Sequence, residues 1–386
     1  MTAVRNLRNR RELAGKVIGF SLSCDAADAA ALGIGAEHLR EALLQIARPL
    51  LRAGAAVAYG GTFQHFPTPA INFTLELLQL IREEQQASEE DDVNEPAAGG
   101  LEVGLPTAAA GQASPFQGLY NHQAWPDYLA LSKPDEAEWV SCCQVVRVSQ
   151  QIAGFDPRDI LPDDADPQRD IDAYMHAVAC RSALRRSLAY GCVIPIDTGT
   201  AGTIMTVPPI SARVFLGGKI TGFNGLMPGV LEELLYAAEA AEAGAVMQGE
   251  RPLFIMGGFG GAAGCAARLI ASGAVDHAPE LTPEFYANPV PGHDDSRYGR
   301  IVREWPKLAG RLPPTTRSPA QAFEALRRQL RRAVADPLGF FQNGLSVADN
   351  RRLLLTVDPL EATRLVLRGL DGVRYWADVA EADGSI

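Results

Sequence analysis

Short apolar runs alternate along this chain with longer stretches of helical periodicity, and this alternation leaves few folds open. The run from Lys16 to Leu22 (KVIGFSL) is rich in Val, Ile and Phe and predicts a buried strand. One apolar helical face follows it, made of Leu39, Leu43, Ile46 and Leu50. A second buried run from Ala55 to Gly61 (AAVAYGG) and a helical stretch over 74–82 repeat the pattern. The order strand, helix, strand, helix predicts parallel strands.

The same alternation continues to about residue 275. Strands are expected over 139–149, 212–219 and 252–258, and helices over 170–190, 228–241 and from about Gly264. Parallel strands need crossover helices on both faces of their sheet, so the predicted fold class is α/β with an open parallel sheet covered on both sides. From about Asp276 the character changes, and helices are expected over 319–334, 347–356 and 360–369.

The chain of 386 residues therefore divides into three parts. Residues 1–15 form an N-terminal tail, residues 16–275 a ligand-binding α/β domain, and residues 276–386 a helical C-terminal extension. Within the domain, residues 83–117 are first acidic (EEQQASEEDDVNEP) and then rich in Ala, Gly and Pro. Such a composition buries too little apolar surface to offset the entropy of ordering, so we expect a mobile insertion there.

Composition excludes several classes of protein. The net charge of -11 disfavours binding to duplex DNA or RNA and to anionic membranes, because those polyanions attract a positive surface. No apolar stretch approaches the roughly 18–20 residues of a membrane-spanning helix, and the basic N-terminus lacks the apolar region of a secretion signal. The cysteines show no CxxC spacing and the histidines no HxxxH or HExxH pattern. We therefore expect reduced thiols, no metal site and a cytoplasmic location.

Pairs of glycines end three of the predicted strands. They are Gly60–Gly61, Gly217–Gly218 and Gly257–Gly258, the last continuing to Gly261. Ligands of open parallel sheets bind outside the carboxyl ends of the strands, where glycine lets backbone N–H groups approach a phosphate. One such pair usually makes only a tight turn, but three at equivalent positions predict a ligand site. The late GGFGGAAG segment lacks an acidic ribose ligand on a following strand, so no dinucleotide cofactor is expected.

Basic residues near these strand ends could neutralise a phosphate. Arg181, Arg185 and Arg186 lie on the predicted helix 170–190, and the first two are four residues apart and share one face. If that face meets the strand ends, it could hold a phosphate bidentately, although a solvated basic face has the same pattern. Lys219 directly follows the second glycine pair, where its ammonium could reach a phosphate or simply end a strand.

Two adjacent glutamates fall in about the first turn of the predicted helix 228–241. Glu232 and Glu233 are favourable there through the helix dipole alone. One carboxylate could also accept ribose hydroxyls or act as a general acid or base. Together with hydroxyls at the strand ends, the predicted ligand contacts are Ser21, Ser23, Gly60, Gly61, Thr62, Arg181, Arg185, Arg186, Gly217, Gly218, Lys219, Pro228, Gly229, Glu232, Glu233, Gly257, Gly258, Phe259, Gly260 and Gly261.

The order of these motifs resembles a known family. The segments HLREALLQIARPLLRAGAAVAYGG, YNHQAWPDYLALS, ACRSALRR, ARVFLGGKITGFNGLMPGVLEELLYA and PLFIMGGFGGAAG together resemble the SLOG superfamily. The likeness is to the prokaryotic branch related to the ligand-sensing domain of TRPM channels, and it covers about 16–273. The end segment NGLSVADNRRLLLTVDPLEATRLVLRGL is similar to that branch as well.

The resemblance implies a Rossmann-like domain that binds nucleotide-derived ligands. Relatives include sensors of ADP-ribose-type signals in channels and antiphage systems, and the LOG-type phosphoribohydrolases. ACRSALRR is similar to the arginine helix of those hydrolases, and MPGVLEELL resembles the end of their PGGxGTxxE motif, with Glu233 on its glutamate. The compact PGGxGT loop is replaced by the longer GGKITGFNGLMPG, and residues 191–211 look like an insertion.

The leading expectation is a sensor of a nucleotide-derived second messenger, with an ADP-ribose-like unit or a cyclic nucleotide. Such a sensor would act as a homo-oligomer or through a separately encoded effector. One alternative is a nucleotide N-glycosidic hydrolase in which Glu233 assists as general acid or base and Arg185 fixes the phosphate. A second alternative is a scaffold that binds no small ligand and contacts proteins through its helical extension.

Overall fold

The computed structural model describes residues 13–24, 26–64, 70–94, 116–195, 204–247, 251–287 and 296–373. Most of the predicted N-terminal tail and residues 95–115 of the predicted insertion lie outside these ranges. Within them, no helix combines the length and the apolar character needed to cross a bilayer.

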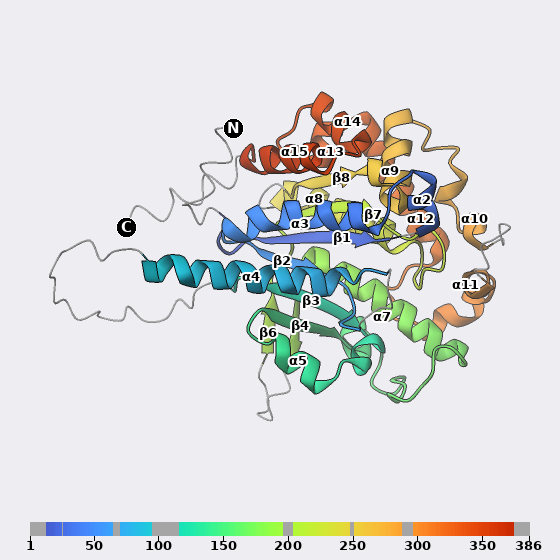
Figure 1. Cartoon of the computed structure of the whole chain (residues 1–386). Helices are drawn as coiled ribbons and strands as arrows, with labels where there is room; N and C mark the ends of the chain where they lie inside the picture. Colours follow the sequence, from blue (N-terminus) through green and yellow to red (C-terminus); the bar gives the residue numbers. More distant parts are fainter. Residues whose placement is uncertain are drawn as a thin grey trace.

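Six parallel strands form one twisted sheet at the centre of the molecule (Figure 1). Their order across the sheet is β4-β3-β2-β1-β7-β8, so the chain extends the sheet to one side of β1 first and then to the other. The crevice at which the direction reverses therefore lies between β1 and β7. The strand bounds are β1 Val17–Ser23, β2 Ala56–Tyr59, β3 Leu119–Ala124, β4 Cys143–Val148, β7 Ala212–Gly217 and β8 Leu253–Met256.

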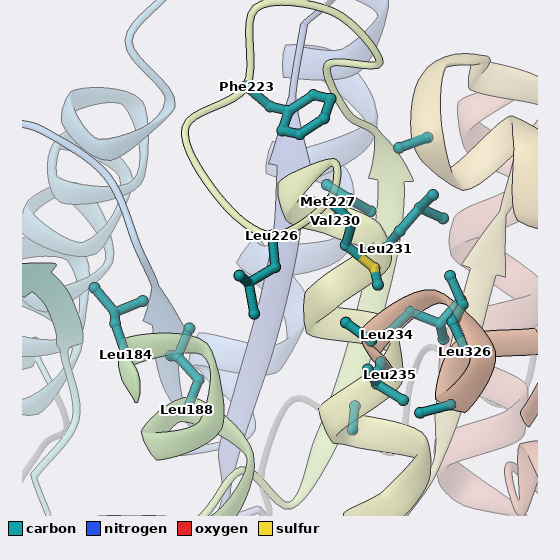
Figure 2. Close-up of a cluster of buried hydrophobic side chains, with 14 of the residues drawn as sticks. Leu184, Leu188, Phe223, Leu226, Met227, Val230, Leu231, Leu234, Leu235 and Leu326 are labelled. Carbon is teal, nitrogen blue, oxygen red and sulfur yellow. The ribbon is translucent and has the colours of Figure 1, made fainter. Parts of the chain in front are cut away.

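Helices cover both faces of the sheet, which confirms the predicted fold class. One buried cluster joins the sheet to α3 (Ala36–Arg52), α4 (Phe73–Asn94) and α15 (Pro359–Asp371). The other joins the opposite face to α7 (Ile171–Tyr190), α8 (Gly229–Met247), α9 (Gly261–Ser272) and α12 (Pro319–Ala335). Figure 2 shows part of this second core, where leucines of α7, α8 and α12 are gathered, among them Leu184, Leu188, Leu231, Leu234, Leu235 and Leu326.

Shorter elements connect and flank these layers. They are α2 (Ala26–Ala31), η1 (Asp127–Ala130), α5 (Lys133–Trp139), α6 (Gln150–Ala153), η2 (Gly257–Phe259), η3 (Pro279–Leu281), α10 (Pro283–Ala287), α11 (Ser296–Leu308), η4 (Ala309–Arg311), α13 (Pro337–Phe341) and α14 (Val347–Leu355). A separate antiparallel pair, β5 (Cys192–Pro195) and β6 (Ile204–Val207), lies inside the stretch 191–211 that looks like an insertion.

The acidic segment after residue 82 differs from the prediction. Residues 83–94 continue α4 as a regular helix, so a mobile insertion beginning at residue 83 is wrong for that part. Glu84 accepts hydrogen bonds from Arg48 at 2.6 Å and from Arg52 at 2.5 Å, both on the neighbouring helix α3. These ion pairs between α3 and α4 compensate the clustered acidic charge. Local composition could not predict them, because the arginines come from another helix.

The C-terminal helices are part of the same core rather than an appendage. Helix α12 packs on α8, and α15 packs on α3 on the other face. Between them, two side chains bind backbone groups at the start of β8: Gln342 Oε1 accepts from the Arg251 N–H just before the strand at 3.2 Å, and Asn343 Nδ2 donates to the Leu253 carbonyl at 2.8 Å. The start of the outermost strand therefore has side chains as backbone partners instead of another strand.

Candidate functional site

A cavity of about 300 Å³ opens at the carboxyl ends of β1, β2, β3 and β7. Its position is the one at which open parallel sheets bind ligands, beside the reversal of strand order. The predicted residues that line it are Ser23, Gly60, Gly61, Thr62, Arg181, Arg185, Lys219, Gly229 and Glu233. Residues that were not predicted also line it: His122, Gln123, Ala124, Asp127, Leu184, Gly222, Phe223 and Asn224.

Two side-chain amides of β3 hold the loop after β2 in place. Asn121 Nδ2 and Gln123 Nε2 both donate to the Gly61 carbonyl, at 3.0 and 3.2 Å. Only glycine fits at position 61, because an added Cβ would lie 2.3 Å from Thr74 Oγ1 and 2.5 Å from the Tyr59 ring. The glycine here serves close packing of the backbone, and the loop reaches the cavity in one defined conformation.

The loop after β7 is held by the end of β1. The Ser23 carbonyl accepts from the Gly218 N–H at 2.6 Å, and Ser23 Oγ accepts from the Lys219 N–H at 2.9 Å. Both Gly217 and Gly218 have positive φ, 59° and 102°, which glycine adopts without strain. The Lys219 side chain is exposed at the cavity, and no carboxylate pairs with it in the described ranges. It is therefore available to an anionic ligand.

The remaining loop, residues 219–228, is anchored by the C-terminal part of the chain. Phe223 packs edge-on against Tyr286 and Tyr298, with ring centroids 5.4 and 4.9 Å apart. The Tyr298 hydroxyl also donates to the Leu226 carbonyl at 2.7 Å. Figure 2 shows Phe223 on this loop beside the second core. The longer loop, which replaces the compact glycine turn of the hydrolases, is thus a packed structure and not a loose excursion.

The two adjacent glutamates at the start of α8 have different surroundings. The Glu233 side chain is 15% exposed, lines the cavity and pairs with Arg213 of β7. The Glu232 side chain is only 1% exposed, does not line the cavity, and pairs with Arg185 of α7 at 2.5 Å. Of the two, Glu233 is therefore the one that can meet a ligand.

Arg185 fastens α7 to the start of α8. Its guanidinium lies so close to the loop that a Cβ at Gly225 would be 2.4 Å from Nη1, and one at Gly229 would be 3.0 Å from Nη2. Arg181 lines the cavity as well, and Asp127 of η1 accepts from its Nε at 2.9 Å and its Nη2 at 2.7 Å. Both arginines face the cavity already paired, whereas Arg186 is not among its lining residues.

The third glycine pair has a different surrounding from the first two. An added Cβ at Gly257 would lie 2.4 Å from the Leu354 carbonyl oxygen, and one at Gly258 2.1 Å from that of Thr356. These glycines let the end of α14 approach the strand end, and they line a separate groove with Arg268 and Arg351. None of the predicted contacts Gly257, Gly258, Phe259, Gly260 and Gly261 lines the cavity that holds Lys219 and Glu233. Ser21, Gly217, Gly218 and Pro228 lie outside its lining too.

Burial sets the protonation of two groups near the cavity. Burial lowers the pKa of His122 to about 3, and the charge of Arg213 adds to that shift, so the imidazole is neutral near pH 7. The pKa of Tyr59 is raised by burial and by the Glu233 carboxylate. Its hydroxyl therefore stays protonated and donates to the Leu22 carbonyl at 3.2 Å.

Arg213 is the main residue that the sequence reasoning missed. It lies in the buried strand β7 and is 2% exposed, and its Nε donates to Ser21 Oγ at 2.5 Å. A signal was present, because an arginine inside the apolar run ARVFLGG is unusual for a strand buried on both faces. His122 and Gln123 were missed because strand β3 alternates polar residues and does not read as an apolar run.

The strand order defines a Rossmann-like domain, with a cavity at the position where such folds bind ligands. The chain belongs to the SLOG family: the family model described as SLOG cluster2 matches residues 12–194 and 203–353. The match runs through α12 and α13 and into α14, and it ends before α15. No curated protein matches the chain.

Proposed function

We propose that this protein is a sensor that binds a nucleotide-derived ligand in the cavity at the ends of β1, β2, β3 and β7. The observation that carries the proposal is the exposed ammonium of Lys219, which pairs with no carboxylate among the described residues, across a cavity that also contains the Glu233 carboxylate. Such a cation suits a phosphate, and a carboxylate suits the hydroxyls of a ribose. A ligand with an ADP-ribose-like unit or a cyclic nucleotide presents both groups.

The paired state of the two arginines favours binding over hydrolysis. A hydrolase of the LOG type would need its arginine free to fix the phosphate, whereas Arg185 is held by Glu232 and Arg181 by Asp127. Hydrolysis is nevertheless the second candidate, because Arg185 and Glu233 do line one cavity. The binding signal would pass to an effector through self-assembly or through a separate protein.

Thermal melting against a panel of nucleotides tests both candidates. The panel contains ADP-ribose, cyclic ADP-ribose isomers, NAD, cyclic nucleotides and nucleoside monophosphates, and each is recovered for mass analysis. A saturable rise in melting temperature with intact ligand supports the sensor, because a ligand that binds only the folded state stabilises it. Recovery of free base with ribose phosphate supports the hydrolase. A melting temperature unchanged by every ligand, with every ligand recovered intact, contradicts both.

Lys219→Ala tests whether the ligand binds in this cavity. Loss of a charge-assisted contact should weaken affinity by about 1.5–3 kcal/mol, or roughly tenfold to a hundredfold. Lys133→Ala, an exposed lysine at the start of α5 outside the cavity lining, is the matched control and should bind as the wild type does. Equal affinity of the two variants would remove Lys219 from the site.

A further inference from the structure

Arg213 is the most deeply buried cation near the cavity. The guanidinium lies between the sheet and helix α8, and burial lowers its pKa while the Glu233 carboxylate offsets part of that effect. Its Nε donates to Ser21 Oγ, its Nη2 donates to Glu233 Oε2, and its Nη1 meets no acceptor in the part of the chain that the structure describes. A charge in such a place is costly unless a partner of opposite charge compensates it.

The pair is asymmetric with respect to the cavity. Arg213 is 2% exposed and does not line the cavity, whereas the Glu233 side chain is 15% exposed and does. The arginine therefore lies behind the carboxylate, on the side away from a ligand. Ser21 of β1 orients the guanidinium from the neighbouring strand, so three elements fix the position of one carboxylate.

We propose that Arg213 is a positioning residue that holds the Glu233 carboxylate at the cavity wall, where it accepts hydrogen bonds from hydroxyl donors of the ligand. The inference rests on the proposed function for the identity of the cavity.

The other titratable groups around Glu233 do not replace Arg213. Tyr59 of β2 faces the carboxylate as a neutral phenol whose hydroxyl donates to a backbone carbonyl. Arg185 of α7 is paired with Glu232, and Lys219 lies at the exposed side of the cavity. His122 of β3 is neutral near pH 7. Arg213 is the cation that touches Glu233 in the described structure.

A double-mutant cycle measures the pairing without any ligand. The variants are Arg213→Met, Glu233→Gln and both together, compared by thermal melting at pH 8. Removal of Arg213 alone leaves a buried carboxylate without a partner and should lower the melting temperature by about 5 °C or more. The double variant should recover at least half of that loss, because neither charge is then buried alone. Additive losses would overturn the proposal.

Arg268→Met is the matched control for the cycle. Its side chain is 61% exposed and pairs with Glu280, so the loss of stability should be small and should add to that of Glu280→Gln.

Titration with ADP-ribose separates this inference from the proposed function. Arg213→Met should bind ADP-ribose about tenfold or more weakly than the wild type, because the Glu233 carboxylate is no longer held at the cavity wall. Arg213→Lys keeps the positive charge and should recover most of the affinity. Wild-type affinity in Arg213→Met, or no recovery in Arg213→Lys, contradicts the inference. Absence of ADP-ribose binding to the wild type contradicts the proposed function with this probe, while the ligand-free cycle still decides the role of Arg213.

Discussion

Gly225→Ala should disconnect the loop 219–228 from α7, because the new methyl group falls on the Arg185–Glu232 pair. The added Cβ would lie 2.4 Å from Arg185 Nη1 and 3.2 Å from Glu232 Oε2, against an ordinary contact of at least 3.4 Å. The guanidinium must therefore withdraw by about 1 Å, and a shift of that size away from Glu232 would stretch their hydrogen bond from 2.5 Å to about 3.5 Å, beyond hydrogen-bond distance. Because the Glu232 side chain is only 1% exposed, water cannot replace the lost hydrogen bond.

The expected loss in the free energy of unfolding follows from these distances. Breaking a buried ion pair costs about 3–5 kcal/mol, and the lower chain entropy of alanine in the unfolded state returns about 0.4–1 kcal/mol. Urea denaturation should thus show a loss of about 2–4 kcal/mol in the free energy of unfolding. Gly222→Ala is the matched control in the same loop: nothing lies within 4 Å of its Cβ, and only its positive φ of 59° opposes alanine, at about 1–2 kcal/mol. If Gly225→Ala costs no more than Gly222→Ala, the Arg185–Glu232 pair does not hold the loop as described.

Two further predictions concern buried groups. The unfolded chain protonates His122 below its ordinary pKa of 6.5, whereas the folded pKa is about 3, so this residue should cost about 2 kcal/mol of stability as the pH falls from 7 to 5. His122→Gln should remove that part of the slope in urea denaturation, and an unchanged slope would show that the imidazole is solvated. Burial raises the pKa of Cys180 and of Cys143 to about 12, so peptide mapping after iodoacetamide at pH 8.5 should find both thiols unmodified in the folded protein and alkylated in urea. Rapid alkylation without urea would contradict their burial.

The sheet could be predicted from the sequence because its strands carry their own signals. Strands β1, β2, β7 and β8 are apolar runs that end in or are followed by small or hydroxyl-bearing residues, and the structure confirms them as parallel neighbours. Strand β3 escaped because Asn121 and Gln123 interrupt its apolar pattern. Those two side-chain amides donate to the Gly61 carbonyl. This role could not be predicted from the sequence of β3 alone, because it depends on β2 lying beside it.

The position of the candidate site could be predicted from the glycine pairs, but only in part. A glycine pair after a strand indicates that something approaches the backbone closely, but not what approaches. At Gly217–Gly218 the backbone turns into the cavity loop, whereas at Gly257–Gly258 the approaching group is the end of α14, about 100 residues further along the chain. Likewise, position in the helix did not separate Glu232 from Glu233 as ligand contacts, because their partners Arg185 and Arg213 come from different elements; only the resemblance to the hydrolase motif pointed to Glu233.

The side chains at the start of strand β8 bear on how this protein avoids sticking to itself. An outer strand with free N–H and C=O groups is a template on which another chain can add a strand and begin an aggregate. Gln342 and Asn343 occupy those groups at Arg251 and Leu253, and Asn350 of α14 holds Asn343 in place at 2.8 Å. The C-terminal segment thus protects the sheet edge. Removing the chain from residue 342 onward would expose that edge and favour β-aggregation.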